Sequence, residues 1–235
     1  MISAFAWLVL HGVALMPAQS AGTPLVGILI DLSSSMTAGS IFLGDRHADF
    51  VSDVATALTR LASTVKEPGP VRLGTFAQSV KLGPPERIAG LPARLLDLDQ
   101  KGGPSPLWDS LIEFSSAFPP EAARGSEIIV VTDGVSTGNR YSRDDARTTL
   151  VSRGLKVCFI DTVGVPRFGD TDSDSAAEVA DILLKFAEAT GGSRVPCGKT
   201  TRTVRTRCEP LMLAAAMTSC LRSPSTTEAI PEAAR

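Results

Sequence analysis

Histidine is scarce in this chain of 235 residues, which contains only His11 and His47. The shortage makes a zinc site improbable, and it leaves a serine hydrolase only His47 outside the apolar amino-terminal stretch. The sequence also lacks a Gly-x-Ser-x-Gly nucleophile elbow and a Gly-x-x-x-x-Gly-Lys-Ser/Thr phosphate-binding loop. We therefore expect the protein not to be an enzyme.

An excess of charge of one sign is missing as well. Lys and Arg number 23 against 25 Asp and Glu, which gives a formal net charge of -2. Such a chain has no broad electrostatic attraction to nucleic acid or to an anionic membrane surface. Beyond residues 2–17, no apolar run approaches membrane-spanning length. We expect no nucleic-acid partner, and no stable membrane span once that first run is removed.

The amino-terminal run has the features of a secretory signal. Residues 2–17 are apolar and uncharged, and Ala18-Gln19-Ser20-Ala21 supplies small residues with the spacing that signal peptidase requires. The pattern predicts a cleaved signal peptide over residues 1–20 and a secreted or periplasmic protein. Two alternatives stay open, an uncleaved amino-terminal anchor and a buried core segment.

Four cysteines, all in the carboxyl-terminal third, can pair in three ways in an exported protein. They are Cys158, Cys197, Cys208 and Cys220. A local bridge between Cys208 and Cys220 is plausible, and so is a bridge from Cys158 to Cys197 between neighbouring strands. Cys158 lies in an apolar run, where a free core thiol is equally plausible. The spacing alone does not fix the connectivity.

The full sequence is rich enough in apolar residues, at 43% by a wide count, to form one full core. Apolar runs at 25–30, 128–131 and 157–160 are typical of strands buried on both faces. Because helical patterns separate these runs, we expect an α/β fold with a mostly parallel sheet covered by helices.

Periodicity and stop signals place the other elements. Helices are predicted over 46–65, 106–118, 142–154 and 175–190, the third with a capping box at Ser142 and Asp145. Residues 71–82 fit a strand, a turn near Ala77 and Gln78, and a short antiparallel partner. The predicted domain spans 24–200, with a cysteine-containing helical extension over 201–222 and a disordered tail over 223–235.

Polar side chains follow two of the buried strands. Asp31 comes at the end of the first, with Ser33 and Ser35 behind it, and Asp133 ends the strand at 127–132. If the two strands are adjacent and the chain reverses its winding between them, both carboxylates meet at a topological switch point, where open α/β sheets bind ligands.

Three segments then resemble one family. Asp31-Leu32-Ser33-Ser34-Ser35 is similar to the Asp-x-Ser-x-Ser of the metal-ion-dependent adhesion site of von Willebrand factor type A domains, and Thr132-Asp133-Gly134 is similar to their Thr-Asp-Gly. The segment 102–111 resembles their Gly-Gly-Thr-Pro-Leu motif, with Ser105 in place of threonine. The resemblance covers about residues 24–197 and includes Ala189-Thr190-Gly191-Gly192 after the last helix of the domain.

The resemblance implies a three-layer, Rossmann-like sheet of strand order 3-2-1-4-5-6 with the third strand antiparallel. It also implies a bound Mg²⁺, with Mn²⁺ or Ca²⁺ as alternatives. The implied metal-site residues are Asp31, Ser33, Ser35, Ser105 and Asp133. Neutral hydroxyls leave the charge of such a cation under-compensated, so an acidic side chain of a protein partner can complete the metal shell, as in cell adhesion.

Other interpretations compete with this one. An Asp-x-Ser-x-Ser string is often only an N-cap or turn, and a capping or loop role is favoured for Asp161 over membership of the site. The acidic run 170–174 lacks the glycine and glutamate of an EF-hand loop. An aspartyl phosphatase requires a second acid where Ser33 stands. A metal-independent assembly subunit and a metal-assisted hydrolase remain as alternative functions.

Overall fold

A six-stranded sheet runs through the part of the chain that the structure, a computed structural model, describes: residues 24–37, 46–66, 69–100, 102–162, 173–197 and 208–222. The strands are β1 (Val26–Asp31), β2 (Val71–Phe76), β3 (Val80–Glu86), β4 (Glu127–Thr132), β5 (Lys156–Asp161) and β6 (Ser193–Pro196). Their order is β3-β2-β1-β4-β5-β6, and only β3 runs antiparallel to its neighbour. The fold class and the strand order expected from the sequence are confirmed.

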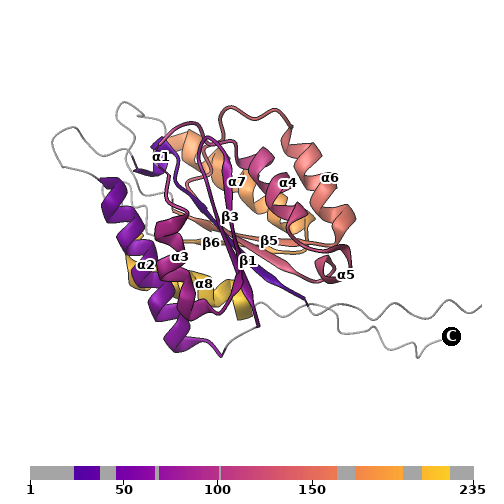
Figure 1. Cartoon of the computed structure of the whole chain (residues 1–235). Helices are drawn as coiled ribbons and strands as arrows, with labels where there is room; N and C mark the ends of the chain where they lie inside the picture. Colours follow the sequence, from indigo (N-terminus) through magenta and orange to yellow (C-terminus); the bar gives the residue numbers. More distant parts are fainter. Residues whose placement is uncertain are drawn as a thin grey trace, which may run out of the picture.

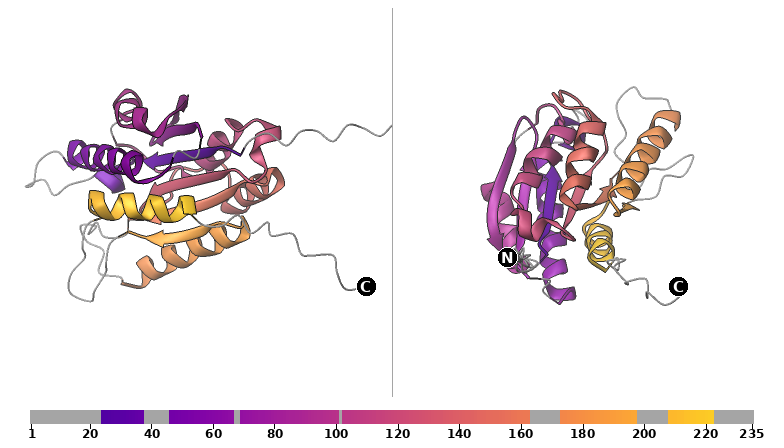
Figure 2. Two further views of the ribbon diagram at one scale, coloured as in Figure 1. Left: turned by 90° about the horizontal axis from the view of Figure 1, so that it is seen from below. Right: turned by 90° about the vertical axis from the view of Figure 1, so that its right-hand side faces the viewer.

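Helices cover both faces of the sheet (Figures 1 and 2). One face carries α2 (Arg46–Thr64), the short η1 (Ile88–Gly90), α3 (Leu91–Asp97) and α8 (Pro210–Arg222). The other carries α4 (Leu107–Ser116), α6 (Arg143–Arg153) and α7 (Ser173–Ala189). Two single-turn helices, α1 (Ser34–Thr37) and α5 (Pro120–Ala123), lie in connections.

The central strands are apolar throughout because both of their faces are buried. In β1, Ile28 and Ile30 pack in the core beneath α2 and α8, whereas Leu29 between them packs in the core beneath α4. Alternate residues of a strand point to opposite faces, so a continuous apolar run supplies both cores. This is the pattern from which the three buried strands were predicted.

Local signals set the helix boundaries. Ser142 caps α6 in a reciprocal capping box with Asp145, and Gly154 ends that helix in the left-handed conformation at φ 69°. The predictions for α2 and α7 are correct to within two residues at each end. Helix α4 begins at Leu107, one residue later than predicted, because Pro106 occupies the N-cap position.

Two features of the fold were not predicted. Strand β3 continues to Glu86 through Pro84 and Pro85, four residues beyond the expected end at residue 82. Proline is tolerated there because β3 is an edge strand, whose outward amides need no partner strand. The short helices η1 and α3 that follow were also missed.

The disulfide pairs differ from both pairs considered plausible from the sequence. Cys158 of β5 is bonded to Cys220 of α8, and Cys197 after β6 is bonded to Cys208 before α8. The described cysteines include no free thiol, so the core-thiol alternative for Cys158 is also wrong.

Register and helix length explain this connectivity. Cys158 is aligned with Ser193 across β5 and β6, so Cys197 lies about 13 Å further along the strand direction. Most of α8, about 15 Å of helix, separates Cys208 from Cys220. Both distances exceed the Cα separation that a disulfide spans, which is 5.9 Å and 5.1 Å in the observed pairs.

Some predictions concern residues that the structure does not describe. The signal peptide over 1–20, the tail over 223–235 and the first part of the extension, 201–207, lie outside the described residues. Within the described ranges, no helix is both long enough and apolar enough to span a membrane.

Candidate functional site

The candidate site lies at the carboxyl edge of the sheet, where β1 and β4 end side by side. The two strands are parallel neighbours, with Ile30 aligned with Val131, so Asp31 and Thr132 are the final residues of adjacent strands. After β1 the chain passes to α2 on one face, and after β4 it passes to α6 on the other. The site is therefore at the topological switch point that the sequence predicted.

Asp31 joins the three segments of the site. Its side chain is fully buried, and its Oδ1 accepts a hydrogen bond from the Ser33 amide at 2.9 Å. Its Oδ2 accepts from the Ser105 hydroxyl at 3.1 Å and from the Thr132 hydroxyl at 2.8 Å. One carboxylate thus contacts the loop after β1, the loop before α4 and the end of β4.

The hydroxyls of the first loop lie close to one another. The Oγ atoms of Ser33 and Ser35 are 3.0 Å apart. Between them, Ser34 fixes the loop to the segment before α4: its amide donates to the Gly103 carbonyl at 3.1 Å, and its hydroxyl accepts from the Gly103 amide at 2.8 Å. The first loop thus brings the Ser33 and Ser35 hydroxyls together and is bonded to the segment that carries Ser105.

Gly103 has a conformation that a larger residue would not adopt. Its φ is 106°, and a Cβ atom there would lie 2.6 Å from Cγ of Gln78. Glycine therefore permits the close approach of this loop to the turn between β2 and β3.

Asp133 places a second carboxylate beside the first. It is 9% exposed, and its Oδ1 accepts from the Val135 amide at 2.9 Å. Burial, followed by the charge of Asp133, raises the pKa of Asp31 to about 7, against the lowering effect of its hydrogen bonds with Ser33 and Thr132. The fold thus holds two carboxyl groups in a buried position where both are charged only at an energetic cost.

All five residues predicted from the sequence meet at this edge, but two supporting residues were missed. Thr132 was noted only as part of a motif, although its hydroxyl bonds Asp31 directly. Thr137 was not noted at all. Its Oγ1 accepts from the Ser105 amide at 3.1 Å, and its own amide donates to the Ser105 carbonyl at 2.7 Å. No local sequence pattern marks Thr137 for this role.

Asp161 is held by a different partner. It ends β5 and is almost fully buried, and its Oδ2 accepts from Nε of Arg194 in β6 at 3.0 Å and also from Nη2 of that arginine. This carboxylate forms an ion pair across the edge of the sheet, a role that the sequence did not predict. The acidic run 170–174 lies outside the residues whose side chains are described.

The donor set suits a hard divalent cation. Two carboxylates and three hydroxyls offer only oxygen, the ligand preferred by Mg²⁺, Mn²⁺ and Ca²⁺. The described residues include no group of three or more His, Cys, Asp or Glu side chains that could hold a metal ion. A cation here would depend on serine hydroxyls, and it would offset the burial and the repulsion by Asp133 that together raise the pKa of Asp31.

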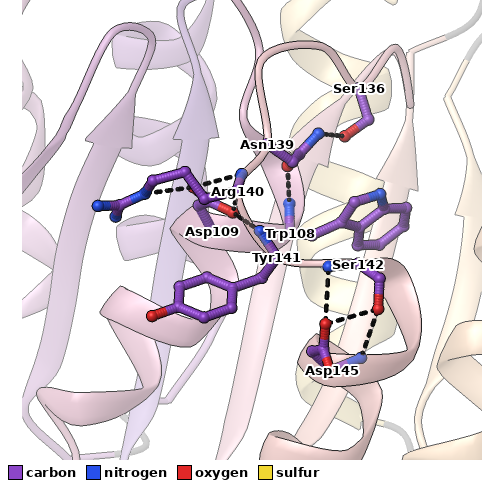
Figure 3. Close-up of polar contacts among 8 residues, drawn as sticks. All are labelled: Trp108, Asp109, Ser136, Asn139, Arg140, Tyr141, Ser142 and Asp145. Atoms are coloured by element: carbon purple, nitrogen blue, oxygen red, sulfur yellow. Dashed lines mark hydrogen bonds and ion pairs between the residues drawn. The ribbon is translucent and has the colours of Figure 1, made fainter.

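The loop after Asp133 is fixed by the first turn of α4 (Figure 3). Asp109 accepts hydrogen bonds from the Arg140 and Tyr141 amides at 2.9–3.0 Å and from Nε of Arg140 at 3.1 Å. The Trp108 amide donates to Oδ1 of Asn139 at 2.9 Å. These hydrogen bonds join the loop to the first turn of α4.

Comparison with known proteins identifies the fold. No protein-family model matches the chain, and no curated protein sequence matches it. An aerotolerance-related membrane protein from Bacteroides fragilis has a similar structure, with 17% identity and a TM-score of 0.53 over 84% of this chain and 98% of that one. BatB from Bacteroides thetaiotaomicron has 17% identity and a TM-score of 0.52, with 85% of this chain and 100% of that one covered.

A von Willebrand factor type A protein from Catenulispora acidiphila has a TM-score of 0.57 at 15% identity. The match covers 84% of this chain and 42% of that protein. Together with the strand order and the antiparallel β3, these similarities show that the chain has the von Willebrand factor type A fold.

Proposed function

We propose that this chain is an exported binding module that recognises a protein partner through a divalent cation, Mg²⁺ or in its place Mn²⁺ or Ca²⁺. The proposed metal-site residues are Asp31, Ser33, Ser35, Ser105 and Asp133. The observation that carries the proposal is the position of Asp31, whose carboxylate contacts all three segments of the site. An acidic side chain of the partner would complete the metal shell.

The roles of the residues follow from their positions. Ser33, Ser35 and Ser105 offer neutral oxygens from two loops, whereas Asp31 and Asp133 would balance the positive charge directly or through metal-bound water. When bound, the cation would supply an open coordination position. If the three hydroxyls bind it directly and the two carboxylates act through water, its nearest protein oxygens are uncharged, and a carboxylate from outside has an electrostatic reason to bind there.

Ser105 stands where the family has threonine, and its environment supports the same role. Its hydroxyl donates a hydrogen bond to Asp31, and its backbone amide and carbonyl both form hydrogen bonds with Thr137. The bond to Asp31 fixes the side-chain rotamer that a threonine methyl group would otherwise help to restrain. The proposal therefore keeps Ser105 as a metal ligand.

Export is supported by the cysteines. The Cys158–Cys220 bond joins β5 to α8, and the Cys197–Cys208 bond joins the end of β6 to the segment before α8. Disulfides persist in oxidising compartments and are rare in reducing ones. We propose a secreted or periplasmic location, reached through the amino-terminal signal.

Isothermal titration of the disulfide-bonded chain with Mg²⁺ and Mn²⁺ tests the metal site. Wild type should bind both ions, and Asp31→Ala and Ser33→Ala should lose binding while retaining the circular dichroism of the fold. Asp181→Ala is the matched control, because that carboxylate lies on the exposed side of α7 and pairs with Lys185. Equal metal affinity in wild type and Asp31→Ala would rule out the proposed site.

Copurification tests the function itself. A partner retained by wild type in Mg²⁺ should be released by EDTA and absent from preparations of Asp31→Ala. A partner that stays bound in EDTA would instead favour a metal-independent assembly subunit. The proposal assigns no catalytic step to the site, and turnover in a screen of phosphoesters would contradict that part of it.

A further inference from the structure

A hollow of about 470 Å³ adjoins the candidate metal site. It lies between the loop after β4, the first turns of α4 and α6, and α7. Its lining includes the apolar side chains of Trp108, Val135, Val179 and Ile182, together with the polar and charged residues Ser136, Ser142, Arg143 and Asp144. None of these residues belongs to the proposed metal ligands.

The hollow offers a fixed apolar surface. The Trp108 ring is 8% exposed and stacks on Phe186 with the ring centroids 5.1 Å apart, so its position is set by the core. Val179 and Ile182 pack against that core but are only partly buried, so part of each remains exposed to solvent. An apolar side chain that enters the hollow would remove the rest of this surface from water.

Gly134 and Val135 lie between the hollow and the candidate metal site. Gly134 follows Asp133 directly and has a φ of 73°, and a Cβ atom there would lie 2.4 Å from Cγ1 of Val179. Val135 lines the hollow while its amide donates to the Asp133 carboxylate. The hollow is therefore within reach of a partner segment whose carboxylate binds at the metal site.

The surroundings of the hollow are preformed. Figure 3 shows the Trp108 ring on the opposite side of the loop from Arg140 and Tyr141, beside Ser142. The bonds of Asp109 and Asn139 hold the intervening loop in place. Binding there would require little ordering of the protein, which favours affinity.

Arg143 and Asp144 both line the hollow and are of opposite sign, so its lining has no net charge. Arg143 has no ion-pair partner among the residues that the structure describes, whereas the neighbouring Asp144 pairs with Arg147 at 3.4 Å. Arg143 also occupies the first turn of α6, where the helix dipole disfavours a positive charge. Its presence is thus not explained by the stability of the helix.

We infer that this hollow receives an apolar side chain, such as Leu, Ile, Met or Phe, from the same partner segment whose carboxylate binds the metal. The inference rests on the proposed function and extends it from an acidic side chain to an acidic and apolar pair at a fixed spacing. The metal site recognises the charge, and the hollow decides which acidic segments bind tightly.

A phage-displayed library of short peptides with a fixed central glutamate tests the inference. The disulfide-bonded full chain is used as the target in Mg²⁺, and peptides that stay bound in EDTA are discarded. We expect enrichment of one large apolar residue at a constant distance from the glutamate. A selected peptide should bind Ile182→Lys about tenfold more weakly than wild type.

Leu184→Lys is the matched control, because Leu184 is an exposed leucine of α7 that does not line the hollow. It should bind the selected peptide as wild type does, and the Mg²⁺ affinity of both variants should be unchanged. If Ile182→Lys does not fold, the milder Ile182→Gln replaces it.

The outcomes separate the two proposals. The hollow is not a binding site if the selected magnesium-dependent acidic peptides show no apolar preference, or if Ile182→Lys binds them as wild type does. Either result would leave the proposed metal-dependent function standing. No magnesium-dependent enrichment, in a chain that does bind Mg²⁺ by titration, would overturn both the acidic partner and the inference.

Discussion

At the scale of single residues, Asp31 is placed where its charge destabilises the fold. Burial first, and then the charge of Asp133, raises its pKa from 3.8 to about 7. Because the carboxyl group binds its proton more tightly in the folded state, the unfavourable contribution is absent below the unfolded pKa. It develops as the pH rises and is complete above the folded pKa.

We therefore predict that Asp31→Asn stabilises the metal-free protein. In EDTA, the free energy of unfolding should rise by about 2 kcal/mol at pH 8 and change little at pH 4. Urea unfolding at both pH values measures the difference. Asp181→Asn serves as a control on an exposed carboxylate, and a destabilised Asp31→Asn at pH 8 would contradict the assignment of the raised pKa.

The residues of the site were predictable where a short stretch of sequence contains the whole pattern. Asp31, Ser33 and Ser35 alternate in one loop, and Asp133 ends a strand whose apolar pattern is clear. The ion pair of Asp161 with Arg194 was not predictable, because it depends on the register of β5 and β6. The same holds for Thr137, which reaches Ser105 only through the path of a loop.

At the scale of elements, the loop between β4 and α6 depends on Asp109 in α4. Its carboxylate accepts bonds from the Arg140 and Tyr141 amides. Burial raises the pKa of Asp109, but these backbone bonds and the Arg140 side chain outweigh it and lower the pKa. The stabilisation is therefore present above the unfolded pKa and is lost as the pH falls through the folded pKa.

Asp109→Asn should loosen this loop without unfolding the protein. We expect a loss of about 1–2 kcal/mol at pH 7, since an amide has one acceptor oxygen and no charge. Hydrogen exchange followed by mass spectrometry should then be faster in residues 135–142 than in wild type. Asp144→Asn in the first turn of α6 is the control, and unchanged exchange in Asp109→Asn would refute the role of Asp109.

Helices whose apolar residues recur with a clear helical period were predicted, and elements without such a period were not. The apolar spacing of α2 and α7 and the capping residues of α6 are visible in the sequence. Helix α3 has only seven residues, too few to repeat an apolar period, and two prolines obscured the end of β3. Helix α3 is positioned by contacts with α2 and β2, and the end of β3 by its pairing with β2, rather than by local preference.

At the scale of the whole molecule, the two disulfides fasten α8 to the far edge of the sheet. The Cys158–Cys220 bond closes a sequence separation of 62 residues and the Cys197–Cys208 bond one of 11. Because a longer loop loses more freedom in the unfolded chain, the first bond should stabilise the protein more.

We predict that the double variant Cys158→Ser, Cys220→Ser loses about 4 kcal/mol of unfolding free energy, and Cys197→Ser, Cys208→Ser about 3 kcal/mol. Urea unfolding of both variants beside the oxidised wild type checks the order. The magnesium affinity should remain in each, because neither bond contacts the metal-site residues. A larger loss of unfolding free energy in the Cys197→Ser, Cys208→Ser variant, whose bond closes the shorter loop, would contradict the chain-entropy explanation.

The two bonds are also nested, with Cys197 and Cys208 lying between Cys158 and Cys220 in the sequence. A chain that emerges amino terminus first presents Cys158 and Cys197 before either of their proper partners. Oxidation at that moment would join the wrong pair. Correct maturation therefore requires that the β5–β6 register form before the thiols react, or that a disulfide isomerase rearrange them afterwards.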